Sequence, residues 1–388
     1  MRVTSDPDPF REATGTATTS GSLRFFYARR PPEPKIKNID RLRIFNVVPL
    51  RFNLAFHSVF YGEVQAGTKM NQNSRLANFP ISFFAMVMGL AGLSIAWEHT
   101  QQTFDLPLRL DYALTPFTAL IFLLLLVLYL LKLLRHPQEV MLEIAHPVKI
   151  NFFPTISISL ILLSIATLQL QPALSHLLWS LGATLHLAFT FYVMNVWIHH
   201  DHFEINHMNP AWFIPVVGNV LVPIAGTAHG HLEISWFFFS IGILFWLVLF
   251  TIIINRVLFH HPLPEKLMPT LFILIAPPAV GFIAYIKLTG GLDHFAHVLY
   301  YSGLFLTLLL LTQLPRFTRL QFYLSWWAYS FPLAAITIAT LLMYRLHGQT
   351  GFAVIGWLLL SVLSLVVTYL LYRTFKAVGG KRICLPDE

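Results

Sequence analysis

The sequence has 388 residues, of which 56% are hydrophobic and only 11% are charged, and its mean hydropathy is +0.64. A water-soluble domain carries about 25% charged residues, so this composition predicts a polytopic membrane protein and argues against a soluble enzyme. The formal net charge of +8 comes from tails and short loops between apolar runs, which indicates orientation in a bilayer and not nucleic-acid binding. The single cysteine, Cys384, excludes an intramolecular disulfide and a multi-thiolate metal site.

Residues 1–78 are rich in Ser, Thr, Pro and Arg, and we interpret them as a cytoplasmic N-terminal tail. Their start has no apolar core of the kind found in a signal peptide. The stretch 44–61 is largely apolar, but Pro49 would break a helix there and Arg51 would place a charge at membrane depth. An interfacial helix, a tail packed on the inner face and disorder are the alternatives for this stretch.

Ten apolar runs follow, each close to the roughly 20 residues that a helix needs to cross a bilayer. They predict an all-α membrane protein with ten transmembrane helices over 79–375, followed by a cytoplasmic C-terminal tail over 376–388. The runs lie near 79–97, 112–134, 152–170, 173–198, 212–228, 234–258, 270–288, 295–314, 322–344 and 352–374.

The basic residues favour one orientation. An even number of spans places both termini on one side, and an excess of Lys and Arg marks the cytoplasmic side. With cytoplasmic termini, the inner loops and helix ends hold Lys132, Arg135, Lys149, Arg256, Lys266, Arg316 and Arg319. The outer equivalents are Arg109, Lys287 and Arg345. We therefore expect an integral protein of the plasma (inner) membrane with both termini inside.

The prolines occur mainly in the odd-numbered apolar runs. The odd-numbered runs carry Pro80, Pro154, Pro215, Pro277 and Pro332, whereas among the even runs only the second has a proline, Pro116. Proline removes a backbone hydrogen bond that lipid cannot replace, so such helices belong where protein or a water-filled cavity surrounds them. This pattern predicts five inner, proline-kinked helices lining a pore and five outer helices, built from a repeated helical hairpin.

The even runs are smoother, and the last four each have one interior glycine, which would let an outer helix approach an inner one closely. These glycines are Gly182, Gly242, Gly303 and Gly356. The middle of the odd runs contains no Asp, Glu, Lys or Arg, whereas ion-coupled pumps generally keep an ionisable group there. A passive pathway therefore fits better than a pump.

The histidines raise the possibility of a metal site or of a haem protein. Several histidines and carboxylates follow the fourth run, and these are residue types that bind zinc. Such crowding in a loop is more typical of a solvated, pH-sensitive surface, so we assign no metal. These residues are His199, His200, Asp201, His202, Glu204 and His207. A haem protein would need facing axial ligands at depth, and only His186 lies well inside a run, so we expect no cofactor.

Four ordered motifs resemble one family: FPISFFAMVMGLAGLSIAW at 79–97, HPVKINFFP at 146–154, NPAWFIPVVGN at 209–219 and SWWAYSFP at 325–332. They are similar to the tellurite-resistance and dicarboxylate-transporter family, which includes TehA and the slow anion channels of plant guard cells. The resemblance covers all ten runs and implies a homotrimer in which each subunit has its own pore. It also implies a phenylalanine that closes the pore near mid-membrane, and SWWAYSFP places that residue at Phe331.

The WWAYSFP form resembles the plant channels more than TehA, which favours a gated channel for small anions such as chloride. A secondary carrier for dicarboxylate, sulfite or a related oxyanion is the alternative that the family also implies. Basic residues at the cytoplasmic mouth could concentrate anions, and Lys149 is the best candidate because it directly precedes the third, pore-lining run. The other reading of Lys149, Arg316 and Arg319 is that they mark topology only.

Overall fold

The computed structural model describes residues 74–199 and 203–384, and these contain helices and turns but no strand. Residues 1–73 of the predicted tail over 1–78, including the stretch 44–61, lie outside the described residues. Nine helical segments in the described ranges are long and apolar enough to cross a membrane, and a tenth, over 210–226, is apolar but shorter. The expected all-helical membrane architecture is confirmed.

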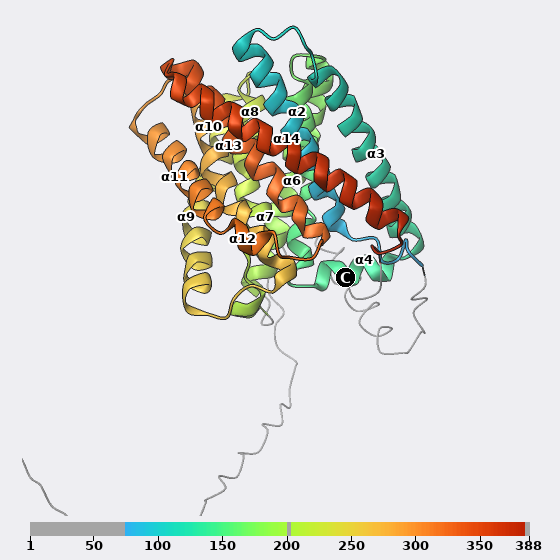
Figure 1. Cartoon of the computed structure of the whole chain (residues 1–388). Coiled ribbons are helices and arrows are strands. Elements are labelled where there is room, and N and C mark those ends of the chain that lie inside the picture. The colour runs from blue at the N-terminus through green and yellow to red at the C-terminus, as the bar shows by residue number, and fades with distance from the viewer. Residues whose placement is uncertain (1–73, 200–202, 385–388) are drawn as a thin grey trace, which may run out of the picture. The chain divides into compact units, whose positions relative to one another are not determined.

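Five long helices each expose most of their length. In each, only 28–39% of the most apolar stretch is buried within the protein, so their side chains are available to lipid or to a partner. In Figure 1, α3 and α9 lie at opposite sides of the bundle, and α14 runs obliquely across it. These outer helices are α3 (Asp111–Arg135), α6 (Pro172–His199), α9 (Leu232–Phe259), α11 (His294–Leu311) and α14 (Thr350–Gly379).

The segments that alternate with them are buried. In the four longest, 78–89% of the apolar stretch is covered, and each begins with a 3-10 turn that continues as an α-helix. They are η1 (Ile81–Phe83) with α2 (Phe84–Phe104), η2 (Lys149–Phe152) with α5 (Thr155–Thr167), η6 (Glu265–Ile275) with α10 (Ala276–Thr289), and η7 (Leu324–Tyr329) with α13 (Ser330–His347).

The remaining buried segment, 210–226, differs from the predicted fifth span in being short and broken. Pro215 and Pro223 each lack a backbone N–H, so a continuous ladder of α-helical hydrogen bonds cannot form through them. The chain alternates between 3-10 and α geometry over η4 (Pro210–Trp212), α7 (Phe213–Val217), η5 (Gly218–Leu221) and α8 (Val222–Gly226). Short helices elsewhere are α4 (Pro137–Ala145), η3 (Ile205–His207) and α12 (Leu314–Phe317).

The structure places four of the five expected kink prolines at the start of a helix. Pro80 precedes η1, Pro154 precedes α5, Pro277 is the second residue of α10 and Pro332 is the third of α13. Proline is tolerated in the first helical turn because the N–H groups there have no partner within the helix. Three of them therefore mark the change from 3-10 to α geometry, while Pro215 lies inside the short α7.

The glycines of the outer helices lie against the buried segments, as predicted. A Cβ atom added at Gly182, Gly242 or Gly356 would meet atoms of Ile161, Val220 and Leu341 at 2.9, 2.2 and 2.9 Å. At Gly303 the nearest atom, of Ala279, would be 3.4 Å away. Each outer helix with such a glycine therefore packs closely on one buried segment.

Candidate pore and gate

A cavity of about 70 Å³ lies among the buried segments. All five buried segments contribute to its wall, which is almost entirely apolar. The lining residues include Ala85 and Met88 of α2, Phe152 and Ile158 around α5, Phe213 and Leu221 of the broken segment, Ile273 and Val280 around α10, and Trp327 and Phe331 around α13.

A second cavity of about 30 Å³ is lined by residues further along the same segments. Its wall is also apolar except for one side chain, His99. The lining residues are Gly92, Ile95 and His99 of α2, Leu162 and Ile165 of α5, Leu221 and Ile224 of the broken segment, Val280 and Ile283 of α10, and Phe331, Ala335 and Ile338 of α13.

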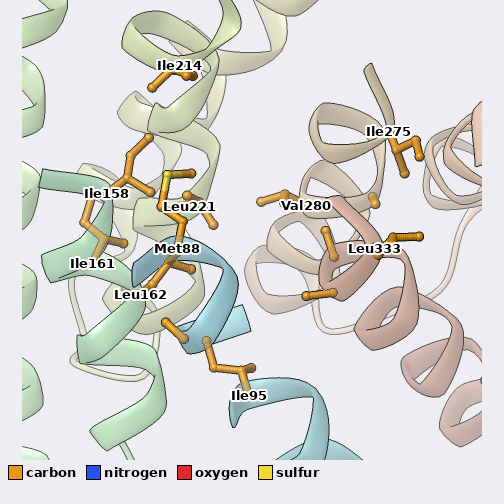
Figure 2. Packing of buried hydrophobic residues seen from close by; sticks show 14 of the residues in the cluster. Met88, Ile95, Ile158, Ile161, Leu162, Ile214, Leu221, Ile275, Val280 and Leu333 are labelled. Carbon is orange, nitrogen blue, oxygen red and sulfur yellow. The ribbon is translucent and has the colours of Figure 1, made fainter. Parts of the chain in front are cut away.

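Three residues, Leu221, Val280 and Phe331, line both cavities. Leu221 and Val280 are only 4% and 5% exposed, whereas Phe331 is partly exposed. Figure 2 shows Leu221 and Val280 reaching in from separate helices of the buried cluster. The two cavities are therefore adjacent, with these three apolar side chains between them, and the ring of Phe331 is the least tightly enclosed of the three.

Two glycines of α2 fix how closely α13 and its phenylalanine approach. A Cβ at Gly89 would lie 2.1 Å from the hydroxyl oxygen of Ser330, and one at Gly92 would lie 2.7 Å from Cβ of Ala334 and 3.5 Å from the Phe331 ring. Since real Cβ atoms do not approach so closely, any larger residue at Gly89 or Gly92 would force the helices apart. The glycines of the first predicted span thus position the Phe331 backbone.

Lys149 is the first residue of η2, three residues before Phe152 of the first cavity, and is not itself part of either cavity wall. His146 lies beside it, and the Nδ1 atom of His146 accepts hydrogen bonds from the backbone N–H groups of Val148 and Lys149 at 3.1 and 3.3 Å. Burial, together with the charges of Lys149, Lys266 and His207, lowers the pKa of His146 below its ordinary value of 6.5. Lys149 and Lys266 are therefore both near enough to His146 to interact with it electrostatically.

The candidate metal and haem ligands do not form a site in the described residues. No group of three or more His, Cys, Asp or Glu side chains there is placed to hold a metal, and His200, Asp201 and His202 lie outside the described ranges. His186 is fully buried, and its Nδ1 atom lies 2.9 Å from the hydroxyl oxygen of Ser157. It packs against Gly218 and lines neither cavity, which indicates a role in helix packing.

Sequence reasoning singled out Phe331 but missed its two partners and His99. Leu221 and Val280 carry no signal, because one aliphatic side chain in an apolar run looks like any other. His99 did carry a signal, since it is a histidine near the end of a proline-bearing run, but the predicted first span ended at residue 97, just before it.

Comparison with known proteins decides the family. The model of the SLAC1 family, described as voltage-dependent anion channels, matches residues 78–375. The chain belongs to this family. The match includes all or most of every transmembrane segment described above, and the family is one of anion channels and not of enzymes.

Relatives of this family member include plant and bacterial proteins. S-type anion channel SLAH3 of Arabidopsis thaliana is 28% identical over 391 residues, covering 96% of this chain and 61% of SLAH3. S-type anion channel SLAH2 of the same plant is 30% identical over 277 residues, covering 69% of this chain and 53% of SLAH2. A tellurite resistance protein TehA homolog of Haemophilus influenzae is 26% identical over 305 residues, covering 76% and 91%. The chain thus spans little more than half of the length of these plant channels.

Proposed function

We propose that this protein is a gated anion channel that conducts passively through a pore within each subunit. The five buried segments would line the pore, the five outer helices would surround them, and Phe331 would close it. The observation that supports this proposal most directly is that two cavities, each lined by all five buried segments, share Phe331 at their junction.

The chemistry of the constriction supports closure by exclusion of water. Leu221, Val280 and Phe331 offer no hydrogen-bond partner to an ion, and stripping the hydration shell from a charge without replacement costs several kcal/mol or more. A narrow apolar constriction therefore blocks ions although no charged group obstructs the way. Displacing the Phe331 ring would join the two cavities and let water enter with the ion.

Lys149 would favour anions on one side of this barrier. Long-range positive potential raises the local concentration of anions without holding them in a fixed site. The neighbouring Lys266 adds to the charge around Lys149. In the orientation expected from the basic loops, this mouth faces the cytoplasm, and the trimer implied by the family resemblance would carry three such pores.

The alternative function, a coupled carrier for an oxyanion, requires different residues along the pore. Carriers driven by protons generally keep an ionisable group at membrane depth to bind the coupling ion. Among the described residues, the walls of the two cavities hold no carboxylate, and His99 is their single ionisable group. These walls therefore favour a channel.

The full-length protein reconstituted in planar bilayers distinguishes the two functions. We expect an anion current whose reversal potential follows the chloride or nitrate gradient and does not change when a pH gradient is imposed. A carrier would give a reversal potential that shifts with the proton gradient. Bilayers without protein, treated with the same detergent, provide the control.

A further inference from the structure

The second cavity contains one side chain that the proposed gate does not use. His99 lies near the end of α2 and is the single ionisable residue among the described residues that line either cavity. Its Nδ1 atom is buried and has no hydrogen-bond partner in the described part of the chain. A buried polar atom without a partner costs free energy, and because His99 lines the second cavity, a ligand in that cavity would supply the missing partner.

The charges around His99 define the kind of ligand. Lys287 of α10 and Arg345 of α13 are near enough to interact electrostatically with the imidazole. Neither cation belongs to an ion pair within the described ranges, where the pairs are Arg109–Asp111 and Lys132–Glu143. Two unpaired cations beside a hydrogen-bonding ring are suited to a small anion.

One acidic residue nearby needs to be weighed. Glu98 interacts electrostatically with Lys287, but it is not part of either cavity wall, and its carboxylate accepts a hydrogen bond from Gln102 at 3.0 Å. Successive residues of an α-helix point about 100° apart, so Glu98 and His99 occupy different faces of α2. The carboxylate therefore reduces the field of Lys287 without entering the space in front of His99.

His99 and Lys149 lie toward opposite ends of the proposed pore. Gly92, which contacts Phe331, precedes His99 by seven residues, which corresponds to about 10 Å along the helix. The first cavity, with Phe152, lies on the other side of the shared constriction. His99 is thus beyond the proposed gate, at the end of the pore opposite Lys149.

We propose that His99, with Lys287 and Arg345, forms a binding point for a small monovalent inorganic anion between the gate and this second mouth. This proposal rests on the proposed channel function. The imidazole N–H donates to the anion, and the two cations attract it from solution. An anion that entered from this side would be held here, partly dehydrated, before it passed Phe331.

Excised patches containing the full-length protein test the site, with the chloride concentration varied on one face at a time. His99→Leu should raise the half-saturating chloride concentration on the His99 side roughly tenfold, the size expected from loss of a hydrogen bond to a charged group. The value on the Lys149 side should not change. His99→Asn keeps an N–H donor and should restore much of the affinity, and His294→Leu, at an exposed histidine of the same end, should behave as wild type.

The double variant Lys287→Gln, Arg345→Gln gives an independent readout, because both side chains are exposed and their loss should not affect folding. It should also raise the half-saturating concentration on the His99 side, and the difference from wild type should shrink as ionic strength rises. If wild type, His99→Leu and the double variant have the same half-saturating chloride concentration, the anion site is overturned but the channel function is not. The same holds if the variants change this concentration equally on both faces of the membrane. A wild-type protein without anion current would overturn the channel function as well.

Discussion

The ammonium group of Lys132 lies 2.9 Å from a carboxylate oxygen of Glu143, and the two side chains are only 2% and 7% exposed. The same ammonium group donates a hydrogen bond to the carbonyl oxygen of Phe79 at 2.9 Å, and the hydroxyl of Tyr129 donates to the carboxylate at 2.8 Å. This network ties α3 and α4 to the start of the first buried segment. Lys132, which sequence analysis treated as a marker of topology, therefore also has a structural role.

Removal of one partner should destabilise the protein strongly, because the other charge would remain buried without compensation. We expect Lys132→Met to lower the free energy of unfolding by about 3–5 kcal/mol. Thermal unfolding of purified protein measures the change. Arg135→Gln is the matched control, since Arg135 lies on the same helix, is exposed and belongs to no ion pair within the described ranges, and its loss should shift the midpoint little. Equal shifts in the two variants would show that the buried pair has no special weight.

Truncation of the proposed gate should increase conduction. Phe331→Ala removes the ring that separates the two cavities, so basal anion current should rise several-fold at equal surface expression. Phe305→Ala is the control, because Phe305 is 62% exposed on the outer helix α11. Wild-type current in a well-expressed Phe331→Ala protein would argue against the gate.

Charge reversal near the first cavity should weaken selectivity. Lys149→Glu replaces the attraction of anions by repulsion, so the permeability ratio of anions over cations should fall, and the reversal potential in a salt gradient should move toward that of cations. The effect should decrease at high ionic strength. Lys381→Glu, in the exposed segment after α14, serves as control. An unchanged reversal potential for Lys149→Glu would show that Lys149 does not affect selectivity and only marks the topology.

The pH on the Lys149 side should modulate the current through His146. Because its pKa is lowered by burial and by Lys149, Lys266 and His207, His146 is neutral near neutral pH and gains a proton only below 6.5. Protonation adds positive charge to this mouth, so anion current should increase as the pH on this side falls below 6.5. His146→Gln should remove this part of the pH response. A variant with the wild-type pH profile would contradict the assignment.

Close packing between outer and buried helices should make Gly242 intolerant of a side chain. Gly242→Val would bring Cβ to 2.2 Å from Val220 and close to its backbone, and we expect a loss of about 1–3 kcal/mol in the free energy of unfolding. Gly351→Ala is the matched control, because no heavy atom lies within 4 Å of the added Cβ there. Thermal melting of both variants compares them, and similar midpoints would contradict close packing at Gly242.

Hydropathy and proline placement predicted the helices well, because both reflect the backbone's need for hydrogen bonds in lipid. The fifth segment could not be predicted in detail, since Pro215 and Pro223 break it into 3-10 and α pieces whose boundaries depend on tertiary packing. At the site, Phe331 was found through a motif. Its neighbours Leu221 and Val280 come from distant parts of the chain, and nothing in an apolar run indicates which side chains will meet.

The three residues at the constriction differ in how freely they can move. Val280 is branched at Cβ and stiff about χ1, and it and Leu221 are tightly enclosed, whereas the partly exposed Phe331 has free space on both sides. For the proposed channel, we therefore expect that rotation of the Phe331 ring about its side-chain torsions clears the passage. Opening by this route would leave the helix axes in place, so a stimulus would need to supply only the energy of a rotamer change.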